Sequence, residues 1–323
     1  MLKLLVKKGM EAALTLLLAT LIIFVLTRLA PGDPIALLLS QQTEVAASDT
    51  TVYERKAEEL RVQWGLDQSL PVQYAEWLKR LVGLDLGQSI HTGRPVGSEL
   101  AERLPATIQL SFAALAIQIA LGLLIGALSA LWAGKASDGL IRFLCVALAS
   151  TPAFVIGLAL LSLFAVTWNV YEISSEDDIA RLWLPAVTLG LIGAPPLIRV
   201  VRANMLAELG QTYILAALAR GLGRRQVVGH ALRNALLPVV TMAGLSLTAL
   251  ISGAVVIESV FSWPGIGKYA LDSILLKDYP VIQGYAFVMV AFIVLIHLLV
   301  DVVYMLVDPR LRRTRKKGAE AYA

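Results

Sequence analysis

Six long apolar stretches dominate this sequence and constrain what it can fold into. A helix that crosses a bilayer needs roughly 20 predominantly apolar residues, because its backbone N–H and C=O groups must pair within the segment. The stretches are Gly9 to Thr27, Leu104 to Gly134, one within Phe143 to Tyr171, Leu182 to Ile198, Asn234 to Ile257 and Tyr279 to Val300. The fourth is short, and we expect Pro195 and Pro196 to bend it. The pattern predicts an all-α polytopic membrane protein with six transmembrane helices.

The composition agrees with this prediction and excludes several other classes of protein. The chain is 57% hydrophobic and only 16% charged, with a mean hydropathy of +0.72. A soluble fold of 323 residues could not bury that much apolar surface. The single cysteine, Cys145, excludes an internal disulfide framework and a cysteine metal cluster.

Lysine and arginine residues flank the spans unevenly, and their distribution predicts the orientation of the chain. Short cytoplasmic loops hold an excess of these residues. One set of segments, which includes both ends of the chain, holds 17 of them, whereas the short loops of the other set hold 3. We therefore expect both termini to lie in the cytoplasm. The basic pI of about 9.2 then reflects topology and not binding to nucleic acid.

The first span starts like a secretory signal, because Lys3, Lys7 and Lys8 precede its apolar run. A signal peptide also needs small residues at a cleavage site. Arg28 stands where a small residue is required, and Pro31 follows shortly after. We expect the first span to remain in the mature protein.

The segment from Pro31 to Pro105, between the first two spans, has the composition of a folded region. It contains 11 acids and 7 bases together with several large apolar side chains. A helical period is visible from Val52 to Trp64 and again from Val72 to Val82. Two short helices are therefore predicted on the outer side of the membrane.

The segment from Asn204 to Arg233, on the cytoplasmic side, is basic and rich in alanine. Its composition favours helix except at Gly221 and Gly223, which predict a turn between two short helices. Such a segment could lie on anionic lipid or could dock a cytosolic partner.

Short motifs occur in a fixed order along nearly the whole chain. They are Ala30-Pro31-Gly32-Asp33-Pro34, Trp64-Gly65-Leu66-Asp67-Gln68, Leu84-Asp85-Leu86-Gly87-Gln88-Ser89, Arg103-Leu104-Pro105-Ala106-Thr107, His230-Ala231-Leu232-Arg233-Asn234-Ala235-Leu236-Leu237-Pro238, Phe261-Ser262-Trp263-Pro264-Gly265-Ile266-Gly267 and Asp308-Pro309-Arg310. In this order they resemble the inner-membrane permease subunits of ATP-binding-cassette (ABC) importers, in the branch that takes up dipeptides, oligopeptides, nickel and metal chelates. The resemblance implies a type I ABC importer permease fold. It also implies a second homologous permease subunit, two cytosolic ATPase subunits and a solute-binding protein as partners, with membrane lipid around the spans.

The same resemblance assigns coupling to the ATPases to one cytoplasmic loop. The general pattern of that loop is Glu-Ala-Ala, three residues and then Gly. Here the residues are Leu215, Ala216, Ala217, Arg220 and Gly221, so that a leucine replaces the glutamate. Two alanines allow a short helix to enter a groove on a partner, and the glycine allows the chain to reverse direction.

No phosphate-binding loop is found in the sequence. Such a loop needs Gly, four residues, Gly-Lys and then Ser or Thr. The nearest fragment, Gly265-Ile266-Gly267-Lys268-Tyr269, lacks the first glycine and the hydroxyl. The resemblance implies that ATP and Mg are bound by partner subunits. We expect this chain to bind no cofactor or metal of its own and not to be an enzyme.

Small and polar residues form stripes on two of the spans. Thr107, Ser111, Gln118, Gly122 and Gly126 share a face of the second span, and Thr241, Gly244, Thr248 and Ser252 share a face of the fifth. The candidates for lining a translocation path are Thr107, Ser111, Gln118, Thr241, Thr248 and Ser252. Close packing of helices is the alternative role, and the spacing of Gly122 and Gly126 fits that pattern.

The resemblance divides the chain into four parts. Residues 1–30 form the cytoplasmic N-terminus and first span, and residues 31–105 a periplasmic segment. Residues 106–307 form the remaining spans with the coupling loop at 204–235, and residues 308–323 a cytoplasmic basic tail. On the outer side, Trp263, Pro264, Gly265 and Gly267 are candidates to contact the binding protein, or alternatively to pack against the sister permease.

His297 and Asp301 stand one helical turn apart within the sixth span. They predict either a metal or proton relay or a local hydrogen bond. An intramembrane hydrolase would pair Ser252 with His297, but the two differ by roughly 15 Å in depth, and a hydrogen bond needs about 3 Å. An ATP-independent channel is the other alternative. The choice of cargo, peptide or nickel chelate, is left open by the sequence.

Overall fold

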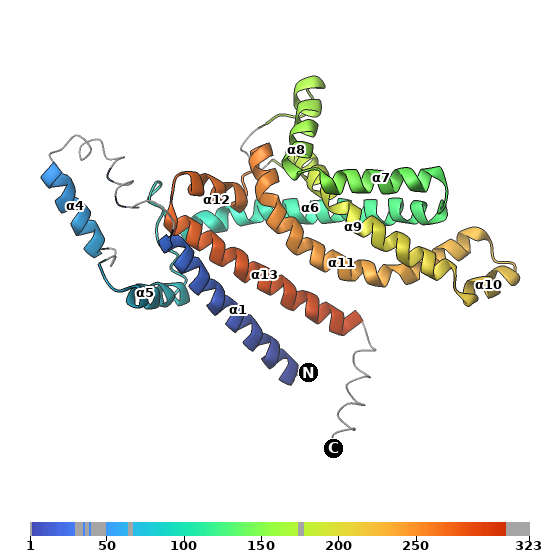
Figure 1. Ribbon diagram of the computed structural model, residues 1–323, viewed down its shortest axis with the longest axis horizontal. Helices are drawn as coiled ribbons and strands as arrows, with labels where there is room; N and C mark the ends of the chain where they lie inside the picture. The colour runs from blue at the N-terminus through green and yellow to red at the C-terminus, as the bar shows by residue number, and fades with distance from the viewer. Residues whose placement is uncertain are drawn as a thin grey trace, which may run out of the picture. The chain divides into compact units, whose positions relative to one another are not determined.

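The protein is helical, as predicted. The computed structural model describes residues 2–29, 35, 39, 50–63, 67–173 and 178–307. The helices are α1 Leu2–Leu29, α4 Thr50–Gln63, α5 Leu70–Val82, α6 Val96–Leu131, α7 Ala136–Ser150, α8 Ala153–Leu161, η1 Ser162–Thr167, η2 Ile179–Arg181, α9 Trp183–Leu209, α10 Thr212–Ala219, α11 Arg224–Phe261, α12 Ile266–Leu275 and α13 Tyr279–Val307 (Figure 1). Within these described residues, β pairing is limited to one isolated antiparallel bridge between Gln88 and Pro95.

The described part of the chain contains five helices that could each cross a membrane, and six candidate spans if one bent pair of helices is counted as a single span. Five single helices are long and apolar enough to cross a membrane: Val6–Leu29, Val96–Leu131, Trp183–Leu209, Pro238–Phe261 and Tyr279–Val300. Counted as one span, the pair Ala136–Ser150 and Ala153–Thr167, which is bent by 102° at its break, gives the sixth. The third predicted span is therefore a broken one.

A proline explains the break in the third span. Thr151 has φ −90° and ψ 128°, and Pro152 has φ −57° and ψ 141°, so both lie outside the helical region. A proline ring clashes with a helical conformation of the residue before it. The chain consequently leaves the direction of α7 and continues as α8, as Figure 1 shows.

The fourth span is the most enclosed by protein. In the most apolar part of α9, 61% of the residues are buried within the protein, compared with 11% in the corresponding part of α1. A helix surrounded by protein needs less apolar surface than one surrounded by lipid, which accounts for its lower hydropathy of 1.6 against 2.3. Pro195 and Pro196 lie inside α9, which continues as one helix across them.

The chain divides into two compact units, one of residues 1–104 and 269–295 and the other of residues 105–268 and 296–323. In the first unit, α5 packs on α1 through the rings of Phe24, Tyr74 and Trp77. The hydroxyls of Thr20 and Tyr74 share a hydrogen bond of 3.0 Å. The amphipathic helix predicted at Val72 to Val82 is therefore present, and its apolar face has a partner.

In the second unit, glycines bring α6 against α9, which also lies beside α11 (Figure 1). A Cβ atom built on Gly122 would lie 2.5 Å from Cδ2 of Leu197, and one on Gly126 would lie 2.7 Å from Cβ of Val201. Only glycine allows this approach. The close-packing role predicted for Gly122 and Gly126 is confirmed.

Candidate functional site

The residues assigned to the coupling loop lie together on α10 and the turn after it. This helix has eight residues and buries the side chain of Ile214, which is 3% exposed. Leu215 and Leu218 are 63% and 47% exposed, and Ala216 is exposed as well. The loop thus presents an apolar surface that faces away from the rest of its own unit.

Gly221 ends α10 in a conformation that favours glycine. Its φ is +84°, in the left-handed region where a Cβ atom is disfavoured. The N–H of Leu222 donates to the carbonyl of Ala217, and that of Gly221 donates to the carbonyl of Leu218. This pair of bonds is a Schellman motif with glycine at the position after the helix cap. The predicted turn is confirmed, but the second helix is not short, because α11 continues from Arg224 to Phe261.

Three side chains near α10 form a closed set of hydrogen bonds, which we name the Glu208 ring. The hydroxyl of Tyr213 donates to Oε2 of Glu208 at 2.6 Å. Nδ2 of Asn234 donates to the same oxygen and to the tyrosine hydroxyl, each at 3.0 Å. The bond to the carboxylate raises the pKa of Tyr213. The ring joins one residue each of α9, α10 and α11.

A buried ion pair connects α7 to α9. The Asp138 carboxylate accepts hydrogen bonds from Nε of Arg202 at 2.8 Å and from Nη2 of Arg202 at 2.7 Å. The Ser129 hydroxyl, at the end of α6, donates to it at 2.6 Å. The Asp138 side chain is 1% exposed and lies in the first turn of α7, where a negative charge is favourable. No local sequence pattern predicts this pair, because its members are 64 positions apart.

The C-terminal end of α11 carries a second buried network, the Glu258 cluster. The Thr107 hydroxyl donates to Oε1 of Glu258 at 2.6 Å, and the Lys268 N–H donates to Oε2 at 2.9 Å. The Thr107 hydroxyl also accepts the N–H of Ile266 at 3.0 Å. A Cβ atom on Gly265 would overlap the carboxyl group. One on Gly267 would lie 2.8 Å from Oε2 and 2.7 Å from Cα of Val255. These two glycines therefore make room for Glu258.

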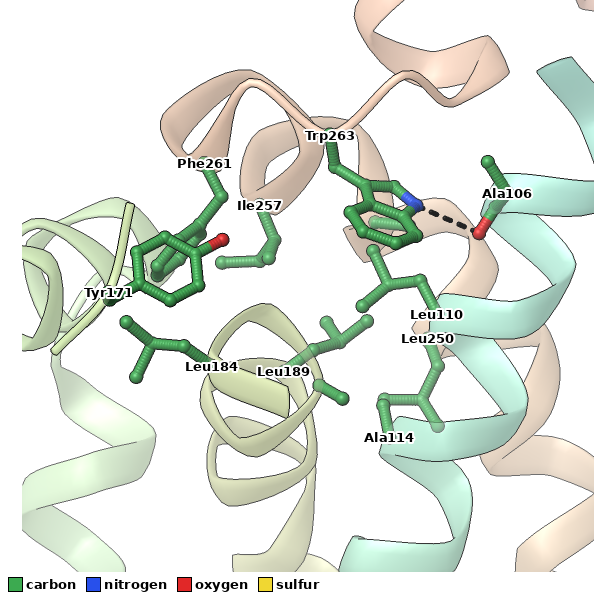
Figure 2. Packing of buried hydrophobic residues seen from close by; sticks show 12 residues of the cluster. Ala106, Leu110, Ala114, Tyr171, Leu184, Leu189, Leu250, Ile257, Phe261 and Trp263 are labelled. Atoms are coloured by element: carbon green, nitrogen blue, oxygen red, sulfur yellow. Dashed lines mark hydrogen bonds between the residues drawn. The ribbon is translucent and has the colours of Figure 1, made fainter. Parts of the chain in front are cut away.

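Trp263 lies inside the second unit and not on its surface. Its side chain is 1% exposed, packs in a core cluster with Leu110 and Phe261, and donates its indole N–H to the carbonyl of Ala106 at 2.9 Å (Figure 2). Gly265 and Gly267 are buried too, and Pro264 is half-buried. The side chain of Trp263 is therefore not available to a binding protein in this arrangement. Packing within its own chain is the role that the structure gives it.

The candidates for the translocation path do not share one open face. Thr107, Ser111 and Gln118 are 2%, 0% and 2% exposed, so these α6 side chains lie within the protein. Nε2 of Gln118 donates to the Ser246 hydroxyl of α11 at 2.9 Å. On α11, Thr248 is half-buried and Ser252 is exposed. The side chain of Thr241 lies outside the described residues.

The His297 and Asp301 pair is described only in part. His297 is exposed on α13, whereas the side chain of Asp301 lies outside the described residues. Neither the relay nor the local hydrogen bond is tested. Across the residues that the structure does describe, no group of three or more His, Cys, Asp or Glu side chains is arranged to hold a metal ion.

The first unit contains a further charged cluster that the sequence analysis did not identify. The Glu99 carboxylate, with a side chain 2% exposed, lies 2.6 Å from Nη1 of Arg94 and 2.7 Å from Nη1 of Arg103. Arg103 also stacks over the ring of Tyr269, at 4.4 Å from the ring centre. Burial raises the pKa of Tyr269 to about 12, so this tyrosine stays neutral at physiological pH.

Comparison with protein families gives two adjoining matches. Residues 122–313 match the family described as "Binding-protein-dependent transport system inner membrane component". Residues 1–111 match the family of the N-terminal part of such membrane components.

Curated relatives resemble the chain over most of its length. The probable D,D-dipeptide transport system permease protein DdpB of Escherichia coli is 37% identical, covering 90% of this chain and 92% of that protein. The dipeptide transport system permease protein DppB of E. coli is 33% identical, covering 92% and 94%. The glutathione transport system permease protein GsiC of Pectobacterium atrosepticum is 35% identical, covering 97% and 99%.

A solved structure has a similar fold. It is a chain of the MetNI methionine ABC transporter in an inward-facing conformation, with a TM-score of 0.51 and 19% identity. The match covers 65% of this chain and 96% of that one.

Proposed function

Since the chain belongs to the family of binding-protein-dependent transport system inner membrane components and is a permease subunit of an ABC importer, we propose that it imports short peptides. The observation that carries the cargo class is the near full-length similarity to permeases whose names specify D,D-dipeptide, dipeptide and glutathione. All three of those cargoes are short peptides. A nickel or metal chelate is the alternative cargo.

The proposed assembly contains this permease, a second homologous permease, two cytosolic ATPases and a solute-binding protein. ATP and Mg would be held by the ATPases, and this chain would supply the helices through which the cargo passes. Alternating access of the permease pair would then move cargo from the outer to the cytoplasmic side. The family favours this function over an ATP-independent channel or an intramembrane hydrolase.

Within that assembly, α10 would be the element that meets an ATPase. Leu215 and Leu218 are exposed, and Arg220 is exposed beside them. Exposed apolar side chains next to a cation suit a groove on a soluble partner. The excess of lysine and arginine on this side of the spans supports a cytoplasmic position for α10.

Uptake into proteoliposomes tests the cargo. The permease would be reconstituted with its sister subunit and ATPases, the binding protein would be added outside, and ATP would be enclosed. We expect ATP-dependent uptake of a radiolabelled dipeptide or of glutathione. Uptake of a nickel chelate without uptake of any peptide would overturn the peptide proposal, and ATP-independent passage through this chain alone would overturn the importer itself.

Substitution of Gly221 by valine tests the coupling role of α10. The expected result is normal membrane insertion with loss of ATP hydrolysis that depends on transport. A β-branched residue at φ +84° would cost about 1–2 kcal/mol or more and would open the Schellman motif that ends α10. ATP turnover by the reconstituted complex, with and without binding protein, is the measurement.

Gly223 provides the matched control, two positions further on. Its φ is −65°, a value that alanine adopts freely, and a Cβ atom there would meet Gln226 Oε1 at 3.9 Å, an ordinary contact. Gly223→Ala should therefore leave ATP turnover unchanged. If Gly221→Val shows the same turnover as this control, α10 is not the coupling element.

Labelling of introduced cysteines tests the orientation. The native Cys145 is free and 5% exposed, so it should give little background. A membrane-impermeant maleimide added outside intact cells should label Leu275→Cys, at the exposed end of α12, and should leave Arg220→Cys unlabelled. The reverse pattern would show that the predicted topology is inverted.

A further inference from the structure

The coupling helix α10 is too short to set its own direction. An isolated helix needs about 12–15 residues to be even marginally stable in water, and α10 has eight. Its buried contact with the rest of the unit is through Ile214. Gly210 and Gln211 join it to α9, and the turn at Gly221 joins it to α11, so both connections are short turns. Something beyond the backbone must hold α10 at a defined angle.

The Glu208 ring lies where it can hold α10 at a defined angle. Tyr213 lies in the first turn of α10, Glu208 in the last turn of α9, and Asn234 three turns into α11. Each of the three side chains is bonded to both of the others. The Glu208 carboxylate accepts two of the three bonds, one from Tyr213 and one from Asn234. Hydrogen bonds to a charged acceptor are stronger than bonds between neutral groups. Three helices are thus tied at one point.

We propose that the Glu208 ring sets the angle of α10 and transmits its movement to α9 and α11. The inference rests on the proposed function of α10 and names the residues through which that function acts. Glu208, Tyr213 and Asn234 are positioning residues, because they act through α10 and need not touch nucleotide or cargo. The two helices that receive the movement pack against each other (Figure 1), so a shift of α10 reaches the core of the unit.

Substitution of Tyr213 by phenylalanine tests the ring with the smallest change of shape. It removes one donor and one acceptor, and so breaks two of the three bonds, while the aromatic ring stays. In the reconstituted complex we expect the amount of bound ATPase to be unchanged and the cargo transported per ATP hydrolysed to fall about fivefold, the size of effect typical of one hydrogen bond. Hydrogen exchange of the α10 amides should become faster in the same sample.

Two further variants separate positioning from general damage. Gln211→Ala changes the neighbouring loop residue, whose side chain makes no cap hydrogen bond to α10, and should leave both readouts unchanged. Combining Tyr213→Phe with Asn234→Ala should lower the transport ratio no further than the more severe single change, because residues of one network are not additive.

The outcomes distinguish this inference from the proposed function. If the unsubstituted chain binds no ATPase, the proposed function fails, whereas the exchange of α10 amides still tests the ring. If the unsubstituted complex couples normally and Tyr213→Phe changes neither the transport ratio nor the exchange, the ring does not position α10. Additive effects of the two substitutions would also overturn the ring as a unit.

Discussion

Replacing Arg202 by alanine is expected to lower the stability of the permease by about 3 kcal/mol. The change leaves the Asp138 carboxylate, whose side chain is 1% exposed, without the two charge-assisted bonds that offset its burial. We take the low end of the range for a broken buried pair because the Arg202 side chain is itself 23% exposed. The apparent Tm of the purified protein should fall by about 5–10 °C, measured by thermal unfolding in detergent.

Arg142 provides the control for this prediction. Its Nε lies 3.8 Å from the same Asp138 carboxylate, but its side chain is 62% exposed. An exposed pair of that kind contributes about 0–1 kcal/mol, so Arg142→Ala should leave the Tm nearly unchanged. The Tm of Arg202→Lys should lie between those of Arg202→Ala and Arg142→Ala, because lysine keeps the positive charge and loses the bidentate geometry. Equal Tm values for Arg202→Ala and Arg142→Ala would show that the buried pair does not stabilise the fold.

Replacing Gly265 by alanine is expected to have a comparable effect at the other buried network. The new methyl group would overlap the carboxyl group of Glu258, which must move away from its partners Thr107 and Lys268. Overpacking costs about 1–3 kcal/mol, and each buried hydrogen-bonding group left without a partner adds about 1–3 kcal/mol. We expect a loss of about 3 kcal/mol and faster tryptic cleavage after Lys268.

Two comparisons test whether the loss comes from the Glu258 carboxyl group. Gly97→Ala places the same methyl group at the start of α6, where no heavy atom lies within 4 Å, and should have almost no effect. Adding Gly265→Ala to Glu258→Ala should cost little more than Glu258→Ala alone, since the overlap is then gone. If instead the two losses add fully, contacts other than the one with Glu258 explain the requirement for glycine.

The spans and the helical loop segments could be predicted because their signals are local in sequence. Apolar length and the distribution of lysine and arginine need no knowledge of which segments touch. The turn at Gly221 was predicted for the same reason, since glycine itself permits the left-handed conformation. The break at Pro152 also has a local cause. The apolar length of the third span nevertheless predicts a continuous helix, because it takes no account of this proline.

The roles of several named residues could not be predicted, because they depend on what lies opposite them. Thr107 and Gln118 lie on the polar stripe of α6, and Ser252 lies on the similar stripe of α11. The first two are buried and bond to side chains of α11, whereas Ser252 is exposed. Trp263 belongs to a motif outside the spans, and its ring nonetheless fills the core (Figure 2). The spacing of residues along one helix shows which of them share a face. It does not show which other helix covers that face.

The sequence by itself determined that this chain carries six long apolar stretches and which family it resembles, and it predicts which loop couples the permease to the ATPases. All three follow from patterns carried by consecutive residues. Only the tertiary structure decided that Asp138 pairs with Arg202, that Glu258 requires glycine at Gly265 and that Tyr213 closes a ring across three helices. The Glu208 ring lies where three helices converge. The contacts of these networks join residues up to 159 positions apart. Their hydrogen bonds form only once apolar packing has brought the helices together.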